Sequence, residues 1–115
     1  IIYDPIGDCY AEPAFRSIGW KGKYLVVGFA AGQIPKLPIN LTLLKGASVV
    51  GVFWGAFTGR EFEENQKNIK DINSMLIAGK IKPLISKKIP MEQAKEAINL
   101  IGSRGVVGKV VLVNN

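Results

Sequence analysis

Two continuous apolar runs constrain the fold of this chain more than any other feature of its sequence. The first run is Tyr24–Val27 and the second is Ser48–Trp54. Neither run alternates apolar and polar residues, as a strand with one solvent-facing side would. Strands that are apolar on both faces are typical of a parallel sheet covered by helices. The sequence therefore predicts an α/β domain built on parallel strands.

The rest of the chain alternates between strand-like and helix-like segments, which implies right-handed crossover connections. Asp8 and Asn40 are expected to cap helices, and Thr58 with Glu61 matches the capping box that begins many helices. Pro90 is expected to be the first residue of the last helix. We expect strands over 1–4, 24–27, 48–54, 81–89 and 108–113, and helices after Asp8, over 41–45, between Thr58 and Gly79, and between Pro90 and Ile101.

Apolar residues at helical spacing predict which face of each helix is buried. The first helix carries its apolar residues four apart, at Tyr10, Ala14 and Ile18. The apolar positions of the two long helices behind it are Phe62, Ile69, Ile72 and Leu76, and then Ala94, Ala97, Ile98 and Ile101.

Composition excludes several classes of function. The 115 residues contain no histidine and one cysteine, Cys9, so a Cys/His zinc site and a Ser-His-Asp triad are excluded within this chain. A single cysteine forms no internal disulfide and suggests a reducing, cytoplasmic location, and we expect Cys9 to be inert packing. The longest apolar stretch, Val49–Phe57, is far shorter than the roughly 20 residues of a membrane span, so no membrane partner is expected.

The net charge of +6 favours anionic partners. The aromatic residues do not interleave with the basic ones as they do on a nucleic-acid platform, so we expect no nucleic acid to bind. A nucleotide cofactor fits better, although no glycine-rich phosphate loop follows a strand. The segment Gly102–Gly108 resembles such a loop, but it follows a helix and precedes a strand.

The candidate site lies where parallel strands end, because ligands of open α/β sheets bind beyond the carboxyl ends of the strands. Three such segments are Asp4–Gly7, Gly28–Gly32 and Phe53–Ala56. Their small and aromatic residues allow a flat ligand to approach the backbone, or they simply form turns. Arg104 is either a phosphate ligand or a cation at a helix carboxyl end. Asp4 and Asp8 either share a site or, as we favour, serve as turn and cap residues.

Six segments carry a resemblance to a known family: Tyr3–Asp8, Arg16–Pro35, Asn40-Leu41, Leu44–Gly46, Gly51–Gly55 and Gly108–Val111. They resemble the NADPH:quinone oxidoreductase (zeta-crystallin-like) branch of the medium-chain dehydrogenase/reductase superfamily. The resemblance implies a fragment equivalent to the last third of such an enzyme. Residues 1–79 would form the second half of a Rossmann-type parallel sheet with flanking helices. Residues 80–115 would be a strand-helix-strand returning to the GroES-like catalytic domain.

The same resemblance implies a site and a reaction. Gly28, Phe29 and Ala30 would lie along NADPH, and Phe53, Trp54 and Gly55 would meet its nicotinamide carboxamide. Arg104 matches an arginine that contacts NADPH in some relatives. The hydride acceptor would be a quinone or conjugated enone, without catalytic zinc, and no residue here stands out as the proton donor.

The resemblance also implies a homodimer that pairs through the strand Ser48–Phe53. Two other readings of the whole protein remain open. One is a zinc-type alcohol dehydrogenase of the same superfamily, and the other is a non-enzymatic dimerising relative. The isolated chain is expected to be inactive, since the phosphate loop is not in it.

Overall fold

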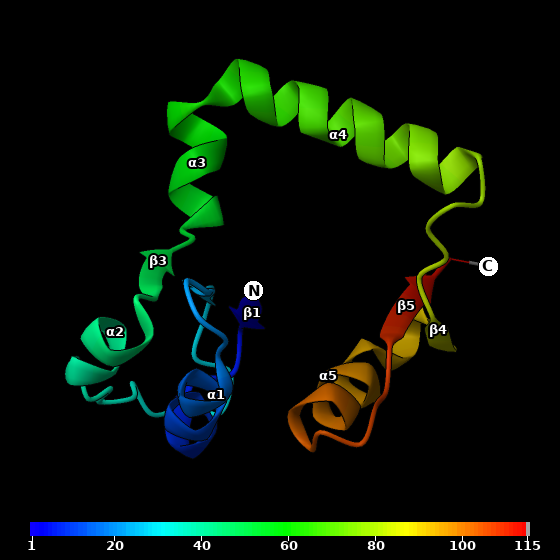
Figure 1. The fold of residues 1–115 in the computed structure, drawn as a ribbon. Coiled ribbons are helices and arrows are strands. Elements are labelled where there is room, and N and C mark those ends of the chain that lie inside the picture. The colour runs from blue at the N-terminus through cyan, green and yellow to red at the C-terminus, as the bar shows by residue number, and fades with distance from the viewer. Residues whose placement is uncertain (115) are drawn as a thin grey trace. The chain divides into compact units, whose positions relative to one another are not determined.

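The structure, a computed structural model, describes residues 1–114, and by its internal contacts the chain divides into two units, residues 1–65 and 66–115. Strands and helices alternate along the chain, which confirms the predicted α/β class (Figure 1). The elements are β1 (Ile2–Asp4), the 3₁₀ turn η1 (Asp8–Tyr10), α1 (Ala11–Ser17), β2 (Lys23–Val26), α2 (Asn40–Lys45), β3 (Ser48–Gly51), α3 (Trp54–Arg60), α4 (Phe62–Ile77), β4 (Ile85–Pro90), η2 (Met91–Gln93), α5 (Ala94–Gly102) and β5 (Lys109–Val113).

The first unit contains a three-stranded sheet in the order β1-β2-β3, and both strand pairs are parallel, as predicted. Asp4 pairs with Val26, and Val26 pairs with Gly51. Because the strands are parallel and in this register, all three carboxyl ends lie at one edge of the sheet. The backbone segments that follow them therefore start side by side.

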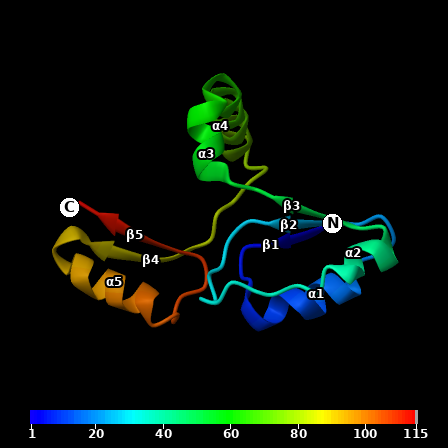
Figure 2. The same cartoon turned by 90° about the vertical axis from the view of Figure 1, so that its left-hand side faces the viewer.

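The core of this unit lies between the sheet and two helices, α1 and α2, which Figure 2 shows on the same side of the strands. Phe15 of α1 meets Tyr24 of β2 edge-on, with ring centroids 5.4 Å apart, a favoured geometry for an aromatic pair. Leu41 supplies the contact from α2. On the opposite face of the sheet, Tyr3 and Val50 are exposed.

The predicted apolar stripe of the first helix is partly wrong. Ile18 is buried and Ala14 packs against the core, as predicted, but Tyr10 is exposed, and the fully buried residues of α1 are Ala11 and Phe15. Tyr10 lies in the 3₁₀ turn η1, before α1 begins at Ala11, so the spacing of an α-helix does not apply to it. The sequence pattern did not reveal that turn.

The three predicted side-chain caps are also wrong. Asp8 lies inside η1 with φ 55°, and its carboxylate accepts from the adjacent Cys9 N–H at 2.6 Å. Asn40 is already the first helical residue of α2, with no side-chain cap before it. The second apolar run turns helical at Trp54, so Thr58 falls within α3, where its hydroxyl donates to the Gly55 carbonyl at 2.9 Å.

Glycines follow the ends of two helices. Gly46 closes α2 in the left-handed region at φ 55°, and Gly79 follows α4 at φ 67°. The apolar residues predicted for α4 do fall on a helix, but Phe62, Ile69 and Ile72 are exposed.

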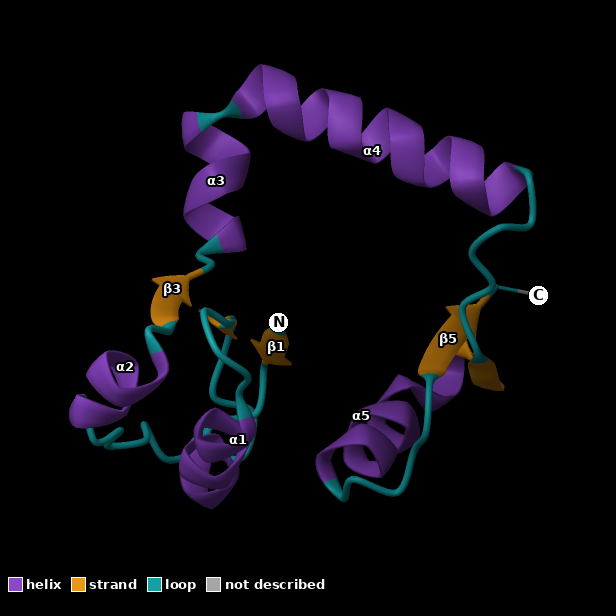
Figure 3. Ribbon diagram, in the orientation of Figure 1, coloured by secondary structure: helices purple, strands orange, loops and turns teal. Residues whose placement is uncertain are grey.

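The second unit pairs β4 and β5 as a parallel, two-stranded sheet, with α5 between them in the chain (Figure 3). Ala97 is buried, but Ile98 and Ile101 are exposed, contrary to the predicted stripe. The small Ala97 side chain is the one that α5 turns inward. Pro90, which we predicted to be the first residue of the last helix, is instead the last residue of β4; η2 begins at Met91 and α5 at Ala94. Pro83 lies ahead of β4, whose pairing with β5 shifts register between Ile85 and Lys87.

Two further expectations concern the chain as a whole. The predicted boundary between residues 79 and 80 stays a prediction. Within residues 1–114, no helix is both long and apolar enough to pass through a bilayer.

Candidate functional site

The loops after β1 and β2 are joined by a ladder of backbone hydrogen bonds at the carboxyl edge of the sheet. Ala30 N–H donates to the Pro5 carbonyl and Ala31 N–H donates to the Ile6 carbonyl, each at 3.0 Å. Asp8 N–H closes the ladder by donating to the Gln33 carbonyl at 3.1 Å. The parallel pairing of the strands thus continues into the loops, and the two loops form one surface.

Asp4, the last residue of β1, organises the start of this ladder. Its Oδ1 accepts from Ile6 N–H at 2.8 Å and from Gly7 N–H at 2.9 Å, which confirms the turn role favoured for it. The backbone carbonyl of Asp4 accepts from Val27 N–H at 2.9 Å and from Gly28 N–H at 3.4 Å. Asp4 is 9% exposed, so these bonds form away from bulk water.

The remaining carboxylate oxygen of Asp4 accepts a hydrogen bond from the Tyr24 hydroxyl of β2. Burial raises the pKa of the Asp4 carboxyl, but the hydrogen bonds from Tyr24, Gly7 and Ile6 outweigh burial and hold that pKa below its ordinary value. Burial, together with the hydrogen bond and charge of Asp4, raises the pKa of Tyr24 well above its usual value. At neutral pH, Asp4 is therefore ionised and Tyr24 is protonated.

The segment Gly28–Ala30 offers a ligand one backbone donor. Gly28 and Ala30 donate to Asp4 and Pro5, whereas the Phe29 N–H has no acceptor within residues 1–114. Gly28 lies close to the first loop, since a Cβ on it would stand 3.3 Å from the Pro5 carbonyl oxygen. This close approach explains a small residue here without any ligand, so the glycine serves the packing of the two loops.

Phe53, Trp54 and Gly55 follow β3 at the same edge. Val52 N–H donates to the Val26 carbonyl at 2.8 Å, which continues the pairing of β3 with β2 for one more residue. Phe53 is 79% exposed and Trp54 is 66% exposed. They border a pocket of about 610 Å³ lined by Gly51, Val52, Phe53, Trp54, Ala56, Phe57, Arg60 and Glu61. The structure thus brings six of the seven predicted site residues to one edge of one sheet.

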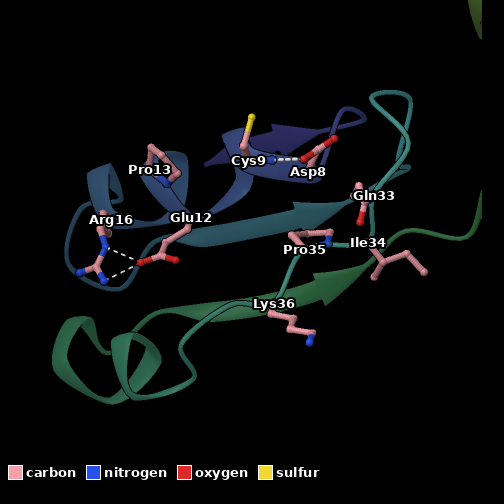
Figure 4. Close-up of a pocket in the computed structure, with 9 residues that line it drawn as sticks. All are labelled: Asp8, Cys9, Glu12, Pro13, Arg16, Gln33, Ile34, Pro35 and Lys36. Atoms are coloured by element: carbon pink, nitrogen blue, oxygen red, sulfur yellow. Dashed lines mark hydrogen bonds and ion pairs between the residues drawn. The ribbon is translucent and has the colours of Figure 1, made fainter.

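A second pocket, of about 690 Å³, lies between α1 and the loop after β2 (Figure 4). Arg16 and Glu12 form an ion pair at 2.6 Å on its wall. Cys9 also lines this pocket and is exposed, so the expectation that it packs in the core is wrong. The remaining residues around it are Asp8, Pro13, Gln33, Ile34, Pro35 and Lys36.

Arg104, the seventh predicted residue, lies in the second unit just after α5. Its backbone is left-handed, with φ 56°, and its N–H donates to the Ile101 carbonyl at 3.0 Å. This is the geometry of a residue that ends a helix. Its predicted contact with the cofactor stays a prediction.

The residues present do not fit a zinc site. The chain has no histidine and one cysteine, and residues 1–114 hold no group of three or more potential metal-ligating His, Cys, Asp or Glu side chains. They fit the ring end of a nicotinamide better, because a free N–H at Phe29 and exposed aromatic side chains lie at one sheet edge.

Sequence reasoning missed the Asp4–Tyr24 pair as part of the site. A tyrosine within a buried strand needs a partner for its hydroxyl, and an aspartate at the end of a neighbouring parallel strand is a suitable acceptor. Tyr24 is 1% exposed, so the signal was present in the apolar run itself.

Comparison with known proteins agrees with this geometry. A sequence profile described as zinc-binding dehydrogenase matches residues 1–112. The chain is 32% identical over 113 residues to the quinone oxidoreductase-like protein 2 homolog of Nematostella vectensis, covering 97% of this chain and 31% of that protein. It is 32% identical over 93 residues to an NAD-dependent alcohol dehydrogenase of Sulfurisphaera tokodaii, covering 81% of this chain and 24% of that protein. The quinone oxidoreductase structure from Pseudomonas syringae superposes with a TM-score of 0.73 at 18% identity, covering 96% of this chain and 34% of that one.

The chain therefore belongs to the zinc-binding dehydrogenase family. The matches also confirm the predicted membership in the medium-chain dehydrogenase/reductase superfamily, with quinone oxidoreductase-like relatives. The structural superposition at 18% identity shows a shared fold. The chain spans about a third of the length of the Nematostella relative.

Proposed function

We propose that the whole protein is an NADPH-dependent oxidoreductase that passes a hydride to a quinone or a conjugated enone. The observation that carries this proposal is the common edge of β2 and β3. Val26 pairs with Gly51 in adjacent parallel strands, so Gly28–Ala30 and Phe53–Gly55 leave the sheet side by side. Two adjacent strand ends provide a ledge for a flat ring.

In this proposal the residues of the chain bind and orient, while the bound nicotinamide supplies the hydride. The free Phe29 N–H is the donor available to a carboxamide oxygen. Phe53 and Trp54 cover the ring and exclude water from it. The phosphates are assigned to residues outside this chain, because the sequence holds no glycine-rich loop between a strand and a helix. No catalytic residue is assigned.

The test uses the complete gene product and follows the loss of NADPH absorbance with a benzoquinone and with an enone. Trp54→Ala is expected to raise the KM for NADPH about tenfold, because it removes aromatic cover from the ledge. Trp20→Ala is the matched control, since Trp20 is a similarly exposed tryptophan, at 71%, before β2 rather than after it. The proposal fails if neither acceptor is reduced, or if both variants raise the KM equally.

The same assay separates the cofactor and the reaction class. Replacing NADPH by NADH tests the cofactor preference, which matters because the Sulfurisphaera relative is described as NAD-dependent. Oxidation of an alcohol that stops on treatment with a chelator would favour the zinc alcohol dehydrogenase instead.

We also propose a homodimer in which two copies pair along β3. This strand is hydrogen-bonded to β2 alone within the described sheet, so its other edge offers unpaired backbone groups. Sedimentation of the complete protein is expected to give twice the chain mass. A monomer at micromolar concentration would contradict this pairing.

A further inference from the structure

We infer that Asp4 is a positioning residue of the cofactor site, because its carboxylate and its carbonyl together hold the segment Gly28–Ala30 in place. The inference rests on the proposed function, which assigns that segment to the cofactor. Asp4 acts through its neighbours and belongs to neither segment of the ledge.

The backbone carbonyl of Asp4 makes the direct connection. It accepts from both Val27 N–H and Gly28 N–H, at 2.9 and 3.4 Å. These two residues are where the chain leaves β2 and turns into the ledge. The position of the Asp4 carbonyl therefore sets the direction in which Gly28 departs from the sheet.

The carboxylate makes a second, indirect connection through the first loop. By accepting from Ile6 N–H and Gly7 N–H, Oδ1 fixes the turn that follows β1. The Pro5 and Ile6 carbonyls of this turn then accept from Ala30 N–H and Ala31 N–H, at 3.0 Å. A change in the turn thus moves the far end of the ledge as well as its start.

Tyr24 locks the carboxylate in its orientation. Its hydroxyl donates to the other carboxylate oxygen, Oδ2, so both oxygens of Asp4 are held. The Tyr24 ring is itself held edge-on by Phe15 in the core. This chain of contacts connects the packed core to the ledge through one ionised side chain, in a region where an unpaired charge is costly.

The test compares Asp4→Ala with Leu41→Ala in the complete protein, at a temperature where both are folded. Leu41 is buried in the same core, and its N–H donates to the Pro38 carbonyl, outside the loop ladder, so its change is expected to lower stability without moving the ledge. Asp4→Ala is expected to weaken the Kd for NADPH about tenfold, whereas Leu41→Ala changes it less than about twofold. The KM for NADPH should rise more than kcat falls.

Two further measurements separate positioning from loss of fold. Amide hydrogen exchange over residues 28–31 should be faster in Asp4→Ala than in Leu41→Ala. Asp4→Asn should restore most of the affinity, because its Oδ1 accepts the same two N–H groups and the Tyr24 hydroxyl can turn to accept from the new amide. If Asp4→Ala does not fold, Tyr24→Phe replaces it. We expect Tyr24→Phe to change NADPH affinity and amide exchange in the same direction, by a smaller amount.

The inference is overturned if Asp4→Ala folds and binds NADPH as the unchanged protein does, or if Leu41→Ala weakens binding equally. It is also overturned if neither Asp4→Ala nor Tyr24→Phe speeds exchange over residues 28–31. If the unchanged protein does not bind NADPH, the proposed function fails instead, and the exchange measurement still tests the positioning role.

Discussion

Gly7 and Phe29 lie so close together that a Cβ on Gly7 would stand 2.9 Å from Phe29 Cδ1. Gly7 also has φ 69°, a conformation that residues with a side chain adopt only with strain. We expect Gly7→Ala to push the Phe29 ring away and to lower the free energy of unfolding by about 1–3 kcal/mol. Denaturant unfolding of the complete protein measures this change.

Gly19→Ala is the control for that substitution, because a Cβ on Gly19 meets no atom within 4 Å. The control variant should unfold within about 0.5 kcal/mol of the unchanged protein. Equal stability of the two variants would show that the contact between Gly7 and Phe29 is not tight in solution.

Removing the Tyr24 hydroxyl should destabilise the protein although the ring contact with Phe15 is kept. Tyr24→Phe leaves a buried oxygen of Asp4 without its donor, which costs about 1–3 kcal/mol. Tyr3→Phe is the matched control, because Tyr3 is exposed on the outer face of the sheet. A loss for Tyr24→Phe no larger than that for Tyr3→Phe would argue against the hydrogen bond.

Asp4 should make stability depend on pH in the acid range. Burial opposes ionisation, but the hydrogen bonds from Tyr24, Gly7 and Ile6 lower the folded pKa below 3.8. The unfolded chain therefore takes up the proton first as pH falls. The stabilisation is complete above about pH 4 and is lost as pH falls through the folded pKa. Asp4→Asn should flatten this part of the unfolding free-energy curve, and an unchanged slope would contradict the assignment.

The opposite dependence is expected for Tyr24 in alkali. Its folded pKa is raised by burial and by Asp4 above the ordinary 10.0. Its contribution to stability is present below that ordinary value and is lost as pH rises through the raised pKa. The phenol absorbance of Tyr24→Phe, subtracted from that of the unchanged protein, should reveal a tyrosine that ionises late.

Gly108 should be as intolerant in the second unit as Gly7 is in the first. Its φ is 93°, and a Cβ there would stand 2.6 Å from the Leu84 carbonyl oxygen. We expect Gly108→Ala to lower the free energy of unfolding by about 2 kcal/mol or more. In contrast, Gly102→Ala at the end of α5 meets no atom within 4 Å and should be neutral or stabilising. The reverse order of stabilities would contradict the placement of β4 beside β5.

Burial patterns made the strands easier to predict than the helix faces. The apolar run at Tyr24–Val27 predicted β2 and its parallel pairing, because a strand whose sequence is apolar on both faces has few alternatives. The structure covers one face of this sheet, and Tyr3 and Val50 on the other face are exposed. The faces of α1 and α5 could not be predicted as well. Both helices follow a 3₁₀ turn, and the residue at which such a turn ends and the α-helix begins is not visible in residue spacing.

The location of the candidate site could be predicted from the sequence, but its hydrogen bonds could not. Parallel strands determine that Gly28 and Phe53 follow the same sheet edge, which needs no detailed geometry. The donor at Phe29 became visible only when the loop ladder had taken up the N–H groups on either side of it. The hydrogen bonds between two loops decide which of their backbone N–H groups stay unbonded. A single sequence does not show how the two loops pair.

The ladder between the loops after β1 and β2 also has a consequence for protein engineering. Pro5, Ile6 and Gln33 accept bonds that tie one loop to the other residue by residue. Transplanting the Gly28–Gln33 loop from a relative by itself would bring in a segment matched to a foreign neighbour. Chimeras should therefore exchange both loops together, as a single cassette that begins at Asp4.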